Sequence, residues 1–316
     1  MVMRKKREGP LFDFSTLIVK ILLIVLLLEN EIQIRNQLNV ALTNVWQFIW
    51  EVLAKEDKWT AFVLLTNVWA AIVYWIVGLA FAFLDFQNFE FIKPYKIQQG
   101  VNEPVDSKKF LGTAVQVLFN QFIVGPSLAV LVLPLLSWRG IDFTANNIPG
   151  LTTFFRHLTG YIFCEEIGFY YSHRLFHEIK PFYKAFHKQH HEWVAPIAIA
   201  ARYAHPVEDI LANVFPVMLG PFLMRSPLVF WWIWLAIAMV STLIGHSGYH
   251  FPWLPSSEFH DFHHLRFDCN YGAFGILDAL HNTDLKFRNS IQSLRHFTLD
   301  SLAPARQRIP DDTKLE

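Results

Sequence analysis

Long runs of apolar residues, separated by short polar stretches, dominate the pattern of this 316-residue chain. Three runs without a charged residue are long enough to cross a bilayer, and they cover residues 60–84, 110–136 and 226–244. A transmembrane helix needs about 20 mainly apolar residues, and a globule of this size cannot hide three such helices in its core. Strand-like runs are short and few. The pattern therefore predicts an all-α integral membrane protein.

Two groups of basic residues indicate the topology. They are Arg4, Lys5, Lys6 and Arg7 before a shorter apolar run at 17–28, and Lys93, Lys96, Lys108 and Lys109 after the run 60–84. Basic residues flank membrane helices on the cytosolic side, so the runs 17–28 and 60–84 are predicted to form a hairpin with both ends in the cytosol. The run 110–136 then leads out, and residues 151–171 return, packed against neighbours because they include charged residues. This gives about four transmembrane helices with a cytosolic N-terminus and a cytosolic histidine-rich half.

Composition narrows the possible functions. The chain is 53% hydrophobic and 17% charged with a formal net charge of zero, so its charge gives no reason to expect nucleic-acid binding. The two cysteines, Cys164 and Cys269, are too few for a disulfide framework or a cysteine-based zinc site. This cysteine usage fits a reducing compartment.

Ten of the fourteen histidines fall into four groups with helical spacing. The groups are His173 with His177; His187 with His190 and His191; His246 with His250; and His260 with His263 and His264. Residues i, i+3 and i+4 share one face of a helix, so each group is predicted to aim its imidazoles at one point. A lone helical histidine usually has a packing role, which suits His157, His281 and His296. Ten grouped imidazoles require a common partner, and a metal ion provides it, since imidazole suits zinc, copper, iron and nickel.

Ten candidate ligands are too many for one structural zinc, which takes four. Two octahedral ions with about five histidines each would use all ten and leave an open position on each ion for a small molecule. A carboxylate-bridged di-iron bundle would require Glu-x-x-His pairs, which Glu166 and Glu178 do not provide. A zinc metalloprotease would require His-Glu-x-x-His, and the sequence has no such motif. The histidines therefore predict a di-metal site in a helical cap beside the membrane helices.

The order HxxxH, HxxHH, HxxHH resembles the fatty acid hydroxylase and sterol desaturase superfamily of membrane enzymes. Five stretches look most like the C4-methylsterol monooxygenases and the fatty acid hydroxylase domain-containing proteins: HRLFH from His173, HKQHHEWVAP from His187, YAHPVE from Tyr203, GHSGYHFP from Gly245, and FHDFHHLRFDCNYGAFGILDALHNTD from Phe259. The resemblance covers roughly residues 110–284. It implies a fatty acid hydroxylase-like catalytic domain at 110–300. The apolar and charged pattern adds a membrane anchor region with a hairpin at 1–109 and a flexible tail at 301–316.

The resemblance implies a non-haem di-iron oxidoreductase whose two iron ions are bound by the ten grouped histidines. The oxidant would be O2, and the electrons would come from NADPH or NADH through cytochrome b5 and its reductase. The enzyme would lie in the endoplasmic reticulum membrane with its histidines toward the cytosol. A fused cytochrome b5 domain would carry His-Pro-Gly-Gly, whereas the only His-Pro pair, His205-Pro206, is followed by Val207 and Glu208. The electron donor is therefore expected to be a separate protein.

Three residues outside the histidine groups are expected to support the site. His205 and Glu208 lie in the matching stretch YAHPVE, where they would orient the metal ligands from outside. His205 would equally suit the start of a helix before a proline. Asn270 lies in the matching stretch after the last histidine group, in a supporting or capping role.

The resemblance favours oxidation of a C4-methyl sterol. A fatty-acyl or sphingolipid hydroxylase and a sterol desaturase are alternatives, because hydroxylation and desaturation both begin with hydrogen abstraction. Residues 279–282 read Ala-Leu-His-Asn where related enzymes carry a basic residue and a glycine, which leaves the substrate open. From other classes, a non-catalytic lipid sensor would keep the same ligands. A metal transporter would place ligands inside its spans, and the run 60–84 has no histidine or acidic residue.

Overall fold

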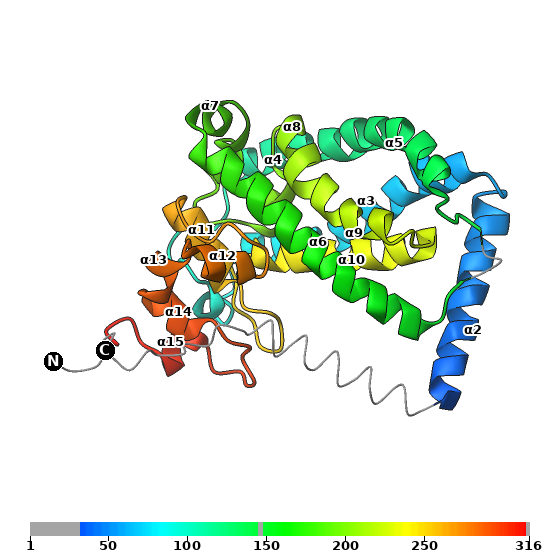
Figure 1. The fold of residues 1–316 in the computed structure, drawn as a ribbon. Helices are drawn as coiled ribbons and strands as arrows, with labels where there is room; N and C mark the ends of the chain where they lie inside the picture. The colour runs from blue at the N-terminus through cyan, green and yellow to red at the C-terminus, as the bar shows by residue number, and fades with distance from the viewer. Residues whose placement is uncertain (1–31, 145–147, 314–316) are drawn as a thin grey trace.

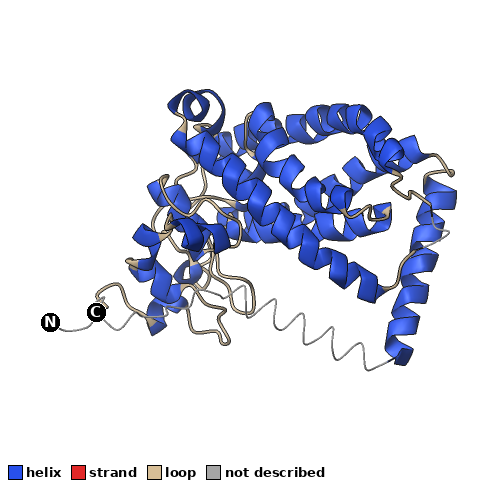
Figure 2. Cartoon of the chain, in the orientation of Figure 1, coloured by secondary structure: helices blue, strands red, loops and turns tan. Residues whose placement is uncertain are grey.

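The computed structural model of the chain describes residues 32–144 and 148–313, and the regular elements within these ranges are helices (Figure 2). An isolated bridge between Lys96 and Tyr249 is the strand-like pairing found there. The predicted all-α fold is therefore confirmed. The apolar run 17–28 and the basic residues that precede it lie outside the described residues.

Four helical segments among the described residues are long and apolar enough to cross a membrane. Thr60–Gln87 joins a π-helical turn, η2 (Thr60–Leu65), to α3 (Thr66–Gln87), and Ser107–Arg139 joins α4 (Ser107–Phe119), η4 (Asn120–Val124) and α5 (Gly125–Arg139). Pro206–Leu223 joins α8 (Pro206–Glu208), η8 (Asp209–Val214) and α9 (Phe215–Leu223), and the fourth segment is α10 (Leu228–Gly245). At 1.5 Å per residue, the 28 residues of the first segment extend about 42 Å. The prediction of a membrane protein with about four spans is confirmed.

One of these segments differs from the sequence expectation. Residues 151–171 belong to α6 (Leu151–Glu178), which is not among the four candidates, whereas Pro206–Leu223 is. The buried Glu165 and Glu166 lower the hydropathy of α6. The other segment has a short apolar run broken by prolines, so the sequence pattern did not reveal it.

Helix α6 nevertheless lies alongside α9, as Figure 1 shows. A Cβ atom added at Gly220 of α9 would lie 2.6 Å from the Cα of Tyr161 in α6, so a larger residue at this position would push the helices apart. Small residues allow such close approach between helices in membranes. The pair α6 and α9 therefore forms a tightly packed wall of the bundle.

Tryptophans lock together the end of the bundle that lies beside α2 (Ile32–Phe48), a helix that crosses the others in Figure 1. The ring of Trp69 in α3 stacks on Trp232 in α10 at 5.7 Å, and Trp46 of α2 meets Trp232 edge-on at 5.1 Å. The indole N–H of Trp232 donates to the hydroxyl of Thr66 at 2.8 Å. Each indole thus buries a large apolar ring while its polar atom keeps a partner.

Short helices form a cap at the opposite end of the bundle (Figure 1). They are α7 (Lys180–Phe182), η5 (Tyr183–His187), η6 (His190–Glu192), η7 (Ala198–Arg202), α11 (Glu258–Arg266), α12 (Ile276–His281), α13 (Leu285–Arg288), α14 (Ile291–Arg295) and α15 (Ala305–Arg308). The remaining short elements are η1 (Ile49–Leu53) and η3 (Lys93–Tyr95).

Residues 301–313, for which the sequence suggested a flexible tail, contact the cap in the structure. Arg306 donates a hydrogen bond to the carbonyl of Ile97 at 2.8 Å, and Arg295 pairs with Asp311 at 2.6 Å. These contacts hold the end of the described chain against the loop that joins α3 to α4.

Candidate metal centre

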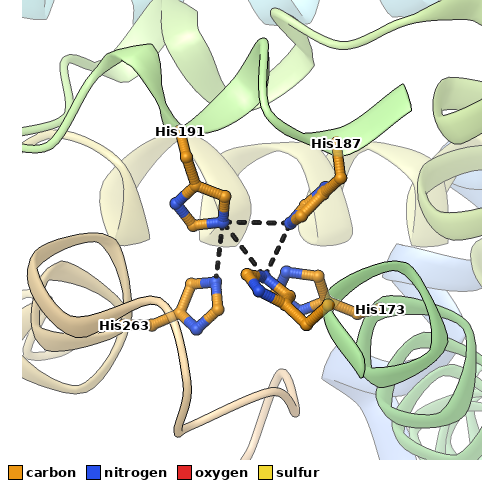
Figure 3. A group of neighbouring side chains, drawn as sticks. His173, His187, His191 and His263 are labelled. Atoms are coloured by element: carbon orange, nitrogen blue, oxygen red, sulfur yellow. Dashed lines mark hydrogen bonds between the residues drawn. The ribbon is translucent and has the colours of Figure 1, made fainter. Parts of the chain in front are cut away.

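Nine histidines gather in two clusters where the cap meets the bundle. Cluster 1 consists of His173, His177, His187, His191 and His263, and cluster 2 consists of His190, His246, His260 and His264. Within each cluster the potential ligand nitrogens all lie within 4.8 Å of one another. Figure 3 shows His173, His187, His191 and His263 with their rings turned toward a common centre.

The two HxxHH triplets do not each serve one cluster, which corrects the expectation that every group aims at one point. His187 and His191 belong to cluster 1 while His190 belongs to cluster 2, and in the second triplet His260 and His264 belong to cluster 2 while His263 belongs to cluster 1. Helical geometry explains the second triplet, which lies on α11. Successive residues turn by about 100°, so the i+4 side chain points within about 40° of the first, whereas the i+3 side chain points about 60° to its other side.

Distances between the ring nitrogens support binding of a single ion by each cluster. In cluster 1 the Nε2 of His191 lies 2.9 Å from that of His187 and 3.2 Å from that of His263. In cluster 2 the Nε2 of His246 lies 2.8 Å from that of His260 and 3.3 Å from that of His190. With nitrogens about 2.1 Å from a metal, neighbouring corners of an octahedron lie about 3.0 Å apart. The observed spacings match these edges.

The other ring nitrogen of several ligands is held by an acceptor. The Nδ1 of His187 lies 2.7 Å from a carboxylate oxygen of Glu208, and the Nδ1 of His263 lies 2.7 Å from the carbonyl oxygen of Cys269. Backbone carbonyls of Tyr271, Thr242 and Trp193 similarly face the Nδ1 atoms of His173, His246 and His264. Because backbone carbonyls and an ionised carboxylate can only accept, each Nδ1 that faces one carries the proton and its Nε2 presents a lone pair.

Lone pairs that face one another at about 3 Å repel unless a cation lies between them. In cluster 2, His246 and His264 both carry their proton on Nδ1, and both Nε2 atoms face the Nε2 of His260, at 2.8 and 3.2 Å. One proton on that nitrogen of His260 could serve only one of these two neighbours. Metal-binding histidines commonly show this arrangement, with one nitrogen on the metal and the other donating to a carboxylate or carbonyl. The donor sets therefore fit metal ions, as the sequence predicted.

Burial keeps these imidazoles neutral. It lowers the pKa of His187 to about 3 and that of His246 to about 4, because the charged form would lose its hydration in the protein interior. Burial also holds the pKa values of His190, His260 and His264 well below the ordinary value, with repulsion from neighbouring histidines adding to the effect. Neutral imidazole is the form that binds metals, so the clusters are ready to bind at neutral pH.

His250, the tenth grouped histidine, lies in neither cluster. Its Nε2 lies 2.8 Å from the carbonyl oxygen of Phe297, and its Nδ1 lies 3.5 Å from a carboxylate oxygen of Glu258. Both ring nitrogens are thus turned toward protein oxygens. The structure therefore brings nine histidines together, five in cluster 1 and four in cluster 2, in place of the expected ten.

The three expected supporting residues occupy different positions. Glu208 is in direct contact with the clustered histidine His187. His205 caps the start of α8, where its Nδ1 accepts from the backbone N–H of Val207 at 3.2 Å. Asn270 donates from its amide nitrogen to the carbonyl of Phe259 at 2.9 Å, so it joins the loop after α11 to the start of that helix.

Two acidic residues, Asp278 and Glu166, hold the loop between α11 and α12. Asp278 accepts from the backbone N–H groups of Tyr271 and Gly272 at 2.7 and 2.6 Å, which fixes the Tyr271 carbonyl that faces His173. Glu166 of α6 accepts from the N–H groups of Phe274 and Leu277 at 2.8 and 2.9 Å. Acidic residues in these stretches were visible in the sequence, but backbone partners leave no side-chain pattern to recognise.

An elongated apolar cavity of about 660 Å³ leads to both clusters. Its walls come from α3, α5, α6, α9 and α10, and its lining includes His173 and His187 of cluster 1 and His190, His246 and His260 of cluster 2. Lining residues on α6 extend from Leu158 to His173, which corresponds to about 22 Å of helix. The volume lies within the range of small-molecule sites, and the length suits an extended lipid.

Comparisons with known proteins agree with this site. A family model described as fatty acid hydroxylase matches residues 158–283, a range that contains all nine clustered histidines. The chain is 40% identical over 273 residues to fatty acid hydroxylase domain-containing protein 2 of Homo sapiens, covering 85% of this chain and 81% of the relative.

Two plant relatives match a shorter part of the chain. Very-long-chain aldehyde decarbonylase GL1-11 of Oryza sativa subsp. japonica is 32% identical over 230 residues, covering 69% of this chain and 84% of the relative. Methylsterol monooxygenase 2-2 of Arabidopsis thaliana is 32% identical over 228 residues, covering 68% of this chain and 83% of the relative. No solved structure matches the chain.

Proposed function

The chain belongs to the fatty acid hydroxylase family, and we propose that it is a membrane-bound di-iron monooxygenase that oxidises a C4-methyl sterol. The observation that carries this proposal is the meeting of two histidine clusters with an apolar cavity of about 660 Å³. An apolar cavity of this size suits a lipid. Because clustered histidines line the cavity, a metal ion bound by them would lie next to that lipid. The two features together favour oxidation of the bound lipid.

The nine clustered histidines are the proposed ligands, with His250 excluded because it faces Phe297 and Glu258. Bound iron supplies one-electron redox chemistry with O2, which amino-acid side chains cannot provide. Glu208 and the backbone carbonyls fix the ring orientations of the ligands, and the apolar lining of the cavity keeps water from the reacting carbon.

The proposed reaction balances with one molecule of O2, two electrons and two protons. One C–H bond of the substrate breaks, one oxygen atom enters to give an alcohol, and the second oxygen atom leaves as water. The electrons would come from NADPH or NADH through separate redox proteins, and cytochrome b5 with its reductase is the proposed route. Insertion of oxygen distinguishes this function from the desaturase alternative, which would form an alkene.

Basic residues support a cytosolic orientation of the clusters, and the endoplasmic reticulum membrane is part of the proposal through the family resemblance. The loop after α3 carries Lys93 and Lys96, and the N–H of Ile97 in this loop donates to Gly248, two residues after His246. Lys109, at the start of α4, donates to the carbonyl of Glu192 beside the ligand His191. This lysine-rich loop therefore lies at the histidine end of the bundle, and basic loops of membrane proteins favour the cytosol.

The names of the relatives include a methylsterol monooxygenase and a very-long-chain aldehyde decarbonylase, so the test must separate lipid classes. Cells that lack this protein would receive either the wild type or His190→Ala, and their sterols, fatty acids and sphingolipids would be profiled. His281→Ala is a matched control, because this exposed histidine lies outside both clusters and contacts Tyr171.

We expect accumulated 4-methyl sterols to be cleared by the wild type and by His281→Ala but not by His190→Ala. If sterols are unchanged but hydroxylated fatty acids or sphingolipids depend on His190, the substrate is a fatty-acyl lipid or sphingolipid and not a sterol. Equal profiles for the wild type and His190→Ala would contradict the oxygenase and favour a non-catalytic lipid sensor.

A further inference from the structure

A glutamate of α6, Glu165, interrupts the apolar lining of the cavity midway along that helix. Glu165 lines the cavity and is only 8% exposed. Its carboxyl group has no hydrogen-bond or ion-pair partner among the residues at 32–144 and 148–313. A polar group that is removed from bulk water without a protein partner is destabilised, so this carboxyl group is expected to meet a partner that occupies the cavity.

The neighbouring Glu166 shows what a structural carboxylate looks like at this point of the helix. It accepts two backbone N–H groups, from Phe274 and Leu277, and so holds the loop beside the metal clusters. Glu165 turns instead into the space that the substrate would fill. The two adjacent acids therefore have different tasks, and packing does not account for Glu165.

The spacing along α6 limits how far the partner group lies from the reacting carbon. Glu165 precedes the clustered histidine His173 by eight residues, which corresponds to about 12 Å of helix. Both side chains lean toward the start of the helix, so their tips keep a similar separation along the axis. A hydrogen bond from the substrate to the carboxyl group takes up about 2.8 Å of this distance. About 9 Å then remains between the polar group of the substrate and the metal ligand His173.

We propose that Glu165 hydrogen-bonds a hydroxyl group of the substrate and thereby selects a lipid alcohol whose hydroxyl lies a few bonds from the carbon that is oxidised. The inference rests on the proposed function, because it assumes that the substrate lies between Glu165 and the clusters. A hydroxyl can both donate and accept, so it satisfies a carboxyl group in either protonation state. A 3-hydroxy sterol with a methyl group on the adjacent carbon meets the distance limit.

A lipid whose hydroxyl or head group lies a dozen or more carbons from the reacting carbon does not meet this limit. An extended chain of that length exceeds the roughly 9 Å that remain between the carboxyl group and His173. Glu165 therefore acts as a specificity-determining residue that excludes oxidation far from a polar group.

Binding, measured apart from turnover, tests this inference. The full chain would be purified into phosphatidylcholine nanodiscs, and tritiated 4,4-dimethylcholestanol would be competed with the unlabelled sterol and with its 3-methyl ether. Ceramide and its O-methylated counterpart form a second pair of competitors. The variants are Glu165→Leu, Glu165→Gln and, as a control on the exposed side of the same helix, Phe163→Leu, since Phe163 is 57% exposed.

We expect the wild type and Phe163→Leu to prefer the free sterol over its ether at least tenfold, which corresponds to about 1.4 kcal/mol. Glu165→Leu should bring the two affinities within twofold, and Glu165→Gln should retain most of the preference because an amide also donates and accepts. A wild type that binds both sterols equally would overturn the inference, and so would a Glu165→Leu variant that keeps the tenfold preference.

Other outcomes separate this inference from the proposed function. If only ceramide binds, with the same dependence on its hydroxyl and on Glu165, the selection of a lipid alcohol stands and the C4-methyl sterol is the wrong substrate. If the sterol preference depends on Glu165 but no oxidation is seen with O2 and electrons, the inference stands and the oxygenase fails. If Glu165→Leu fails to fold, the comparison of the free sterol with its ether in the wild type and in Glu165→Gln still tests the inference.

Discussion

Loss of the Glu208 carboxylate should weaken metal binding by cluster 1. His187 donates from Nδ1 to Glu208 at 2.7 Å, and the two residues are 1% and 3% exposed. Glu208→Leu would leave this buried donor without its charged acceptor, at a cost of about 1.5–3 kcal/mol. The His187 ring would lose its fixed orientation, and its Nε2 would become less basic. Metal affinity should therefore drop about 10- to 100-fold.

Titration of the purified, metal-free protein with ferrous iron under anaerobic conditions measures this effect. Glu208→Gln should lose less than tenfold, because its amide oxygen still accepts from His187. Glu192→Gln is the matched control, since this exposed acid lies next to His191 but its carboxylate accepts from Tyr203. Wild-type affinity in a folded Glu208→Leu protein would refute the reasoning that this carboxylate supports a metal ligand.

Three further changes probe other parts of the site. His191→Ala and His264→Ala, one from each cluster, should each lower the bound iron measured by mass spectrometry, and an unchanged content in both would contradict the assignment of the clusters. Gly248→Ala should destabilise the protein by about 1–3 kcal/mol in thermal unfolding, because its φ is 72° and an added Cβ would lie 2.7 Å from the carbonyl oxygen of Pro196; a wild-type midpoint would disprove this strain. Asp278→Ala should lower the free energy of unfolding by about 2 kcal/mol or more, because the hydrogen bonds from Tyr271 and Gly272 are lost. An unchanged free energy of unfolding would show that the loop does not depend on this carboxylate.

The histidine pattern in the sequence predicted most of the candidate site. Helical spacing was informative for the pair His173 and His177, which lie in α6, and for the triplet on α11. Spacing alone could not reveal that neighbours such as His263 and His264 serve different clusters, because that division depends on how α11 is rotated against the rest of the cap.

His250 shows where the spacing argument fails. It follows His246 by four residues, as a helical partner would, but α10 ends at Gly245 and the chain then turns at Gly248. The turn sends the His250 side chain toward Phe297, away from cluster 2. An HxxxH pattern predicts a shared face only where the backbone between the two residues is helical.

The membrane segments were predictable where they are uniformly apolar. Thr60–Gln87 and Leu228–Gly245 agree with the runs seen in the sequence, whereas Pro206–Leu223 was missed. Pro216 and Pro221 interrupt its apolar stretch, and its first residues include Glu208 and Asp209, which are buried against His187 and Arg202. Polar residues that find partners inside the protein do not prevent a helix from lying in a membrane, but the sequence does not show those partners.

Incorporation of isotope from labelled dioxygen tests the central claim most directly. The purified protein in nanodiscs would receive iron, an electron-donor system, 4,4-dimethylcholestanol and ¹⁸O₂, in parallel with His264→Ala. The account predicts an oxidised sterol that carries ¹⁸O from the wild type and none from the variant. Unlabelled product, or labelled product in equal amount from His264→Ala, would contradict an oxygenase that depends on the histidine clusters.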